Sequence, residues 1–212
     1  MKIDIRGLSE DQIIEFFEKK GFDSYRGRQV YEWIWRKSCY SFDEMTNISK
    51  DLRNVLDNHF VINHIQVDKI QKSFDGTIKN AVKLHDDHTV ESVLIPTDDR
   101  TTACVSSQVG CSLDCKFCAT SKLKRMRNLN PDEIYDQVVT INDQSLKYFN
   151  RPLSNIVYMG MGEPLMNYNN LIKSIEKISS DKGLNMSQKR IVVSTSGIPK
   201  MIKKLADENL KV

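Results

Sequence analysis

Three cysteines with the spacing of a metal site fall within eight residues of the sequence, at Cys111, Cys115 and Cys118. Gly110 leads into this loop, and three thiolates placed so closely can surround one compact centre. A closed structural zinc site takes four ligands, usually as two separated pairs. Three cysteines without an obvious fourth partner instead fit a 4Fe-4S cluster with one iron left open. An open iron can bind a substrate or cofactor, so the pattern predicts a catalytic cluster.

The alternative for this loop is a zinc site completed by Cys104, His85 or His88. The cluster is favoured because the loop follows residues 103–109, which read as the first strand of a βα barrel, where such folds place their catalytic loops. The fifth cysteine, Cys39, lies apart from the others between an aromatic helix and a loop. We interpret it as a small packing residue.

Two further loops follow predicted strands and carry groups suited to a polar ligand. Residues 160–164, Gly-Met-Gly-Glu-Pro, follow the strand 155–159. Their small residues allow the backbone to approach a ligand, and Glu163 can accept hydrogen bonds from an ammonium group. Ser194 and the two hydroxyl residues after it end the strand 190–194. These hydroxyls can meet a carboxylate or a ribose, although the same run also suits a helix-capping turn.

Strands alternate with amphipathic helices from residue 99 onwards, which predicts parallel strands joined by right-handed crossovers. Asn130 followed by Pro131 predicts the start of one of these helices. The predicted fold class is α/β, with residues 99–212 forming the N-terminal half of a barrel of about three strand–helix units. Three parallel strands leave open edges and half a core, so we expect a truncated barrel from a longer protein.

The first part of the chain predicts a small helical accessory domain over residues 1–62. Ser9 and Gln12 have the spacing of a capping box at the start of the first helix, and Gly21 is a stop signal at its end. Apolar residues at helical spacing continue through two further helices. They predict a small bundle with a modest core.

Residues 63–98 predict a β-hairpin connector, because Asp75 and Gly76 separate two runs with alternating apolar and polar residues. In the strand 89–96, Glu91 shares a face with apolar residues. It therefore lies either at an exposed end of the strand or in a functional site.

The composition is that of a globular protein with 40% hydrophobic and 28% charged residues. No apolar run approaches the roughly 20 residues that span a bilayer, and the start lacks the apolar segment of a secretion signal. We therefore expect a cytoplasmic protein whose thiols stay reduced. The net charge of +3 is small, but lysines and arginines crowd into residues 116–127. That run is either a solvated face or a contact for a phosphate-rich substrate.

Together these motifs resemble those of a known family. The C-x3-C-x2-C spacing, with Phe117 before the last cysteine, is similar to the signature of the radical S-adenosylmethionine (SAM) superfamily. The string TVESVLIPTDDRTTACVSSQVGCSLDCKFCAT, with GMGEP and VVSTSG downstream, resembles the bacterial methyltransferases that modify C2 of an adenine in 23S ribosomal RNA and in transfer RNA. The resemblance runs the whole length of the chain. A sibling family that methylates C8 of the same adenine shares most of these motifs.

The resemblance implies two cofactors, a 4Fe-4S cluster and SAM. Three cysteines would each bind one iron, and the fourth iron would chelate SAM through its amino and carboxylate groups. The matching positions for the cluster are Cys111, Cys115 and Cys118, and those for SAM are Gly162, Glu163 and Ser194. The implied partners are 23S ribosomal RNA and transfer RNA, docked by the helical domain, and an electron donor such as flavodoxin or ferredoxin. We also expect the protein to be a monomer that does not contact a membrane.

The resemblance also implies a radical route to the methylated adenine. One electron would cleave SAM to a 5′-deoxyadenosyl radical, which would take hydrogen from a methyl group carried on a cysteine. Glu91 matches the general base of this family, and Cys104 matches the cysteine that resolves the protein–RNA crosslink as a disulfide. A radical route suits this substrate because an aromatic C2–H is neither acidic nor nucleophilic, and a base must still remove the ring proton.

No cysteine follows Cys118, so the methyl-carrying cysteine of that family is missing from these 212 residues. We therefore expect this chain to assemble the cluster but not to methylate RNA alone. The alternative from a different class is a non-catalytic, zinc-stabilised RNA-binding protein. The two differ in their inorganic content: about four irons and four sulfides per chain for the enzyme, against one zinc and no sulfide.

Overall fold

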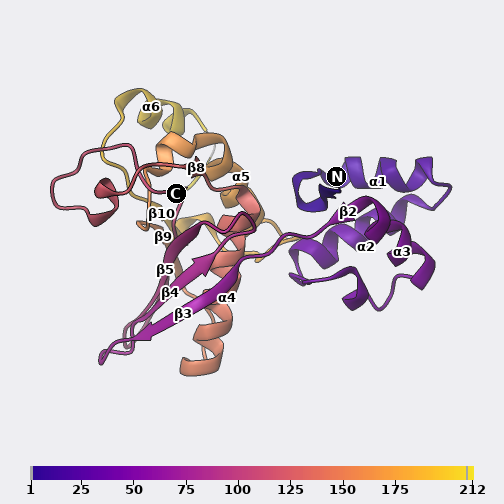
Figure 1. Ribbon diagram of the computed structural model, residues 1–212, viewed down its shortest axis with the longest axis horizontal. Helices are drawn as coiled ribbons and strands as arrows, with labels where there is room; N and C mark the ends of the chain where they lie inside the picture. Colours follow the sequence, from indigo (N-terminus) through magenta and orange to yellow (C-terminus); the bar gives the residue numbers. More distant parts are fainter. Residues whose placement is uncertain (1, 209) are drawn as a thin grey trace. The chain divides into compact units, whose positions relative to one another are not determined.

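The computed structural model describes residues 2–208 and 210–212, and its chain forms two compact units (Figure 1). The N-terminal unit contains the described residues up to His64 together with Ser180–Asn185. The C-terminal unit contains Ile65–Ser179 and Met186–Val212. Among the described residues, no helix combines the length and the apolar character that a membrane span requires.

Helices dominate the N-terminal unit, as the sequence predicts. They are α1 (Glu10–Lys19), α2 (Ser24–Trp35) and α3 (Lys50–His59), with the short helices η1 (Ile5–Gly7) and η2 (Phe42–Glu44). Strands β1 (Ile3–Asp4) and β2 (Phe60–Val61) pair in parallel beside them. The capping box of Ser9 and Gln12 is present, and Gly21 follows α1 with a φ of 79°. Cys39 is buried, in agreement with its interpretation as a packing residue.

Helices α1 and α2 approach each other closely at Gly27. A Cβ atom at this position would lie 2.7 Å from the Cα atom of Ile14, which belongs to the backbone and cannot rotate away. We expect Gly27→Ala to lower the free energy of unfolding by about 1–2 kcal/mol, because overpacking outweighs the better helix propensity of alanine. Urea unfolding followed by the fluorescence of Trp33 and Trp35, both in α2, measures the change.

Gly7→Ala is the matched control for this prediction, because a Cβ atom there has no neighbour within 4 Å. It should change the unfolding free energy by less than about 0.5 kcal/mol. Equal effects of the two substitutions would contradict the close approach of the helices.

The C-terminal unit contains, within the described residues, a six-stranded sheet in the order β10-β9-β6-β5-β4-β3. Its strands are β3 (Gln66–Lys72), β4 (Ile78–Lys83), β5 (Thr89–Pro96), β6 (Thr101–Cys104), β9 (Asn155–Tyr158) and β10 (Ile191–Val193). Strands β6, β9 and β10 are parallel, which confirms the α/β class and the parallel strands predicted beyond residue 99. From β3 to β6, each strand is antiparallel to its neighbour in the sheet.

The connector predicted over residues 63–98 contains strands β3, β4 and β5 of the same sheet. Its hairpin turns at Gly76, as expected, with a φ of 85°. Strand β5 then pairs directly with β6, so that Val93 lies opposite Cys104. The alternating apolar and polar residues predict these strands, but they do not show which strands pair with each other.

The C-terminal unit also contains helices within its described residues. They are α4 (Pro131–Phe149), α5 (Tyr168–Ser179) and α6 (Pro199–Asp207), with the short helices η3 (Ala119–Lys122), η4 (Pro164–Asn167) and η5 (Gln188–Arg190). Helix α4 runs alongside the strands and packs on β5 and β6 (Figure 1). It begins with the predicted Asn130–Pro131 pair, and Ile134, Val138 and Ile141 are buried.

One predicted strand is wrong in its extent. The sequence predicts a continuous strand over residues 103–109, but β6 ends at Cys104. The chain then leaves the sheet, and the short strand β7 (Gln108–Val109) pairs with β8 (Arg127–Asn128) instead. These two short strands form the base of the cysteine loop. The break has a physical cause in the side chains of residues 106–108, which bond to the loop after β9 and to β8 as well as to β5.

Candidate cofactor site

A pocket with a volume of about 280 Å³ lies at the carboxyl ends of β9 and β10. Three segments line it: the cysteine loop, the glycine-rich loop after β9 and the hydroxyl residues after β10. Six of the residues singled out in the sequence are in its wall, namely Cys111, Cys115, Cys118, Gly162, Glu163 and Ser194. Residues up to 85 positions apart in the chain thus face one space.

The cysteines of the pocket have free thiols, as does every cysteine in the described part of the chain. Burial raises the pKa of Cys118, but hydrogen bonds from the N–H groups of Ser121 and Thr120 outweigh it, so the pKa lies below the ordinary thiol value. A thiolate is the form that binds iron. Within the described residues, no three His, Cys, Asp or Glu side chains converge as the ligands of a single metal ion would. Cysteines of a cluster bind different irons, so a cluster does not require that convergence.

Glu163 places a carboxylate at the pocket wall with only 3% of the residue exposed. Its Oε1 accepts hydrogen bonds from the N–H of Leu165 (3.0 Å) and from the Thr195 hydroxyl (2.8 Å). Its Oε2 accepts from the N–H of Ser196 at 2.8 Å. No lysine or arginine in the described residues pairs with it, so its charge lacks a cationic partner. A ligand ammonium group would supply that partner, and the residue therefore fits SAM.

Glu91 and Cys104 do not line this pocket. They lie on adjacent strands, and both are on the sheet face opposite the one that α4 covers, since the alternate residues Val90 and Leu94 are buried. The Glu91 carboxylate is half exposed and pairs with the Lys79 ammonium at 2.9 Å. Burial raises the pKa of Cys104 above the ordinary thiol value, a shift opposed by a hydrogen bond with the backbone of Met159.

Sequence reasoning missed the polar segment Ser106, Ser107 and Gln108, which is fully buried. The Ser106 hydroxyl bonds to the carbonyl of Glu91 on β5 and accepts from the N–H of Met161 at 2.8 Å. The N–H and carbonyl of Ser106 are both bonded by the side-chain amide of Gln137 on α4. The available signal was a polar triplet inside an otherwise apolar strand.

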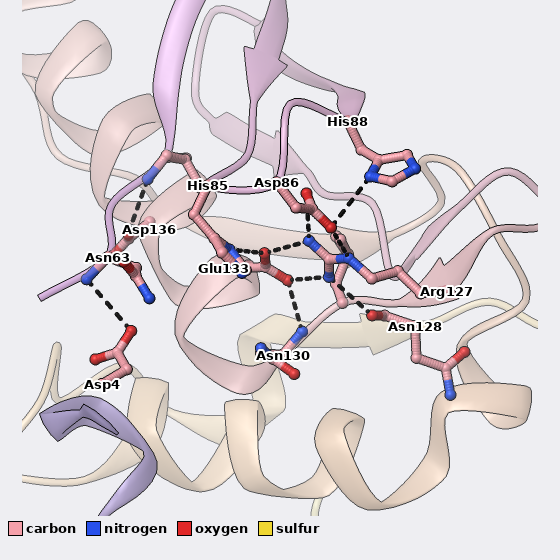
Figure 2. Close-up of polar contacts among 12 residues, drawn as sticks. Asp4, Asn63, His85, Asp86, His88, Arg127, Asn128, Asn130, Glu133 and Asp136 are labelled. Carbon is pink, nitrogen blue, oxygen red and sulfur yellow. Dashed lines mark hydrogen bonds and ion pairs between the residues drawn. The ribbon is translucent and has the colours of Figure 1, made fainter. Parts of the chain in front are cut away.

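A second missed feature is an ion-pair cluster at the base of the cysteine loop, around Arg127 (Figure 2). The guanidinium lies between two carboxylates. It donates to Asp86 at 2.5 and 3.0 Å and to Glu133 at 2.8 and 2.7 Å. The hydrogen bonds to Glu133 and then to Asp86 raise the pKa of Arg127, and the bond from Arg127 holds the pKa of Asp86 well below its usual range.

This cluster also accounts for the two histidines considered as zinc ligands. His85 Nδ1 lies 3.3 Å from Glu133, and His88 Nδ1 lies 3.1 Å from Asp86 (Figure 2). Neither lines the pocket. Arg127 is part of the basic run 116–127 in the sequence, but its side chain is paired with Asp86 and Glu133. The other basic residues of that run are exposed, namely Lys116, Lys122, Lys124 and Arg125.

The fold and the pocket define a class: an α/β half-barrel with a three-cysteine loop after its first parallel strand and a Gly/Glu loop after its second. The model of the radical SAM superfamily matches residues 105–212. This chain belongs to the radical SAM superfamily, whose members use SAM and a 4Fe-4S cluster. A second family model, described as the ribosomal RNA large subunit methyltransferase N-terminal domain, matches residues 3–62.

Two curated relatives are similar to this chain over nearly its whole length. The chain is 70% identical over 211 residues to a probable dual-specificity RNA methyltransferase RlmN of Christiangramia forsetii and spans 60% of its length. It is 41% identical to the dual-specificity RNA methyltransferase RlmN of Desulfotalea psychrophila and spans 59% of it. The crystal structure of a radical SAM methyltransferase from Sphaerobacter thermophilus superposes with a TM-score of 0.88 at 36% identity. That likeness covers 99% of this chain and 62% of the other.

Proposed function

We propose that this chain carries the cofactor site of an RNA methyltransferase that modifies C2 of an adenine in 23S ribosomal RNA and in transfer RNA. The observation that carries the proposal is the single pocket onto which the cysteine loop, the Glu163 loop and the Ser194 loop all open. The names of the relatives support the substrate class, and the match over residues 3–62 supports RNA docking by the N-terminal unit.

Each wall of the pocket has its own task in this proposal. Cys111, Cys115 and Cys118 hold the cluster through their thiolates. Glu163 accepts hydrogen bonds from the SAM amino group and at the same time fixes the loop after β10 through Thr195 and Ser196. Ser194 adds a hydroxyl for the carboxylate or ribose. When bound, the cluster and SAM would supply the 5′-deoxyadenosyl radical that starts a radical route to an unactivated aromatic carbon.

The remaining predicted residues act on the adenine and on the sulfur. Glu91 removes the ring proton as general base, and its pair with Lys79 keeps the carboxylate at the open sheet face. Cys104 lies on the next strand, and its thiolate attacks the sulfur that crosslinks protein and RNA. A disulfide forms, the bond between that sulfur and the carbon on the adenine breaks, and the released carbon takes up a proton to become the methyl group. The raised pKa of Cys104 keeps most of this thiol protonated at neutral pH, so this step needs a base to take its proton.

The partners follow from the same proposal. The exposed basic residues between 116 and 125 offer contacts to RNA phosphates. A one-electron donor such as flavodoxin or ferredoxin reduces the cluster. The protein works as a monomer in the cytoplasm, where its RNA substrates are.

Anaerobic incubation of the reconstituted chain with SAM and dithionite tests the cofactor site. We expect 5′-deoxyadenosine to form, because the cysteine loop, the Glu163 loop and the Ser194 loop all line the pocket. Glu163→Gln should lower its rate by about tenfold or more, since the SAM amino group loses a charged acceptor and the loss of a charge-assisted hydrogen bond is of this size. Adenine methylated over many turnovers is not expected, because no cysteine follows Cys118 to carry the methyl group.

The control for this assay is Glu176→Gln, which makes the same substitution on the surface of α5, outside the pocket. It should cleave SAM at the wild-type rate. Absence of 5′-deoxyadenosine from a chain with its full iron content would contradict the proposed cofactor site. Multiple-turnover methylation by this chain would contradict the need for a methyl-carrying cysteine.

A further inference from the structure

Gln108 connects two walls of the pocket without lining it. It is the last residue of the buried polar segment and has no exposed surface. Its side-chain oxygen accepts a hydrogen bond from the N–H of Glu163 at 2.9 Å. Its side-chain nitrogen donates to Asn128 at 2.8 Å, on the strand by which the chain leaves the cysteine loop. One planar amide therefore bonds to both the SAM-facing loop and the base of the cysteine loop.

The loop after β9 also packs directly on this side chain. Gly162 has a φ of 94°, and a Cβ atom there would lie 2.5 Å from the Cβ of Gln108. The backbone N–H of Gln108 in addition donates to the carbonyl of Met161 at 3.1 Å. The position of Glu163 relative to the cysteine loop is thus set through Gln108 by hydrogen bonds on one side and by contact on the other.

We propose that Gln108 is a positioning residue that couples the cysteine loop to the SAM-facing loop. It would hold the cysteine loop and Glu163, the acceptor for the SAM amino group, at a fixed separation. The inference deepens the proposed function and rests on it, because SAM must touch both walls at once. The contact with the cluster and the hydrogen bond to Glu163 would both contribute fully to SAM affinity only if the two walls do not move relative to each other.

A glutamine is required at this position for a chemical reason. The site needs one acceptor and one donor on a rigid planar group. Glutamate keeps the acceptor for the Glu163 N–H but cannot donate to Asn128. Leucine has a similar volume and offers neither group, so it leaves the buried N–H of Glu163 without a partner.

The test compares Gln108→Leu with Gln144→Leu in the reconstituted chain. Gln144 is a buried glutamine on α4, and its amide exchanges hydrogen bonds with Asn80 at 3.0 and 2.7 Å, outside the pocket. Both variants lose a buried amide. The readout is the electron paramagnetic resonance spectrum of the reduced cluster, titrated with SAM. This reports SAM binding at the iron without any turnover.

Both variants are expected to keep their iron, because the three cysteines are unchanged. Gln108→Leu should weaken SAM binding by about tenfold or more, the effect of losing one well-placed buried hydrogen bond and the rigidity it gives. Gln144→Leu should bind SAM within about twofold of the wild type, although it is less stable. Gln108→Glu, which keeps the bond to Glu163, should fall between the wild type and Gln108→Leu. It also serves as the test variant if Gln108→Leu does not fold.

Two failures can be told apart in this experiment. A wild-type chain that forms no cluster, or whose spectrum does not respond to SAM, overturns the proposed function and the inference with it. A responsive wild type, with Gln108→Leu or Gln108→Glu binding SAM as tightly as Gln144→Leu, overturns the coupling by Gln108 alone.

Discussion

Cys115→Ala is expected to remove the iron–sulfur cluster from the anaerobically reconstituted chain. Each of the three thiolates holds one iron, and two remaining cysteines cannot keep a four-iron cluster in an open pocket. Iron and sulfide should fall from about four each per chain to well below one, and SAM cleavage should become undetectable. Colorimetric iron and sulfide assays, normalised to protein concentration, measure the loss. Cys111→Ala and Cys118→Ala should behave in the same way.

Cys104→Ala is the matched control for this prediction. Cys104 is the other cysteine of the C-terminal unit, and it does not line the pocket. This variant should retain the iron and sulfide of the wild type. If Cys104→Ala loses metal as completely as Cys115→Ala does, Cys104 is a ligand, and the site would be a four-cysteine site rather than a cluster with an open iron.

Arg127→Met is expected to have the largest effect on stability. The substitution leaves the buried carboxylate of Glu133, with 4% of its side chain exposed, and that of Asp86 without their shared cation. Removing one partner of a buried pair costs about 3–5 kcal/mol of unfolding free energy. Thermal unfolding measured by circular dichroism reports the change. Because β7 and β8 form the base of the cysteine loop, hydrogen exchange should also increase at these strands.

Arg100→Met is the control for this prediction, since Arg100 pairs with Asp99 on the surface, where both side chains are more than half exposed. An exposed pair contributes less than about 1 kcal/mol.

The pH dependence of stability provides a second check. The lowered pKa of Asp86 stabilises the wild type above the ordinary carboxyl value of 3.8, and this contribution is lost as the pH falls below it. The stability difference between wild type and Arg127→Met should therefore narrow in acid. Equal effects of the two methionine variants at neutral pH would contradict the role of Arg127.

Local signals in the sequence predicted most of the elements. The capping box of Ser9 and Gln12, the turn at Gly76 and the Asn130–Pro131 helix start each depend on a few neighbouring residues. The alternation of strands and helices beyond residue 99 likewise predicted the parallel strands, because such connections have few alternatives. The pocket residues could be predicted as well, since the carboxyl ends of parallel strands meet at one edge of a sheet.

Long-range pairings could not be predicted in this way. Ser180–Asn185 belongs to the N-terminal unit, where Lys182 pairs with Glu10 at 2.5 Å across the sequence. The break after Cys104 depends on partners of Ser106 that lie on β5, on α4 and after β9. Arg127 reads as one more cation in a basic run until Asp86 and Glu133 are placed beside it. These features can be recognised only in the tertiary structure, because the interacting residues are far apart in the sequence and no local pattern indicates which residues pair.

Metal analysis of the anaerobically purified chain tests the cofactor site most directly. With Cys111, Cys115 and Cys118 as ligands of a 4Fe-4S cluster, the reconstituted protein should contain about four irons and four sulfides per chain. It should also show a paramagnetic spectrum on reduction that shifts when SAM is added. One zinc per chain, with neither iron nor sulfide taken up on reconstitution, would contradict the assignment and indicate a zinc-stabilised protein instead.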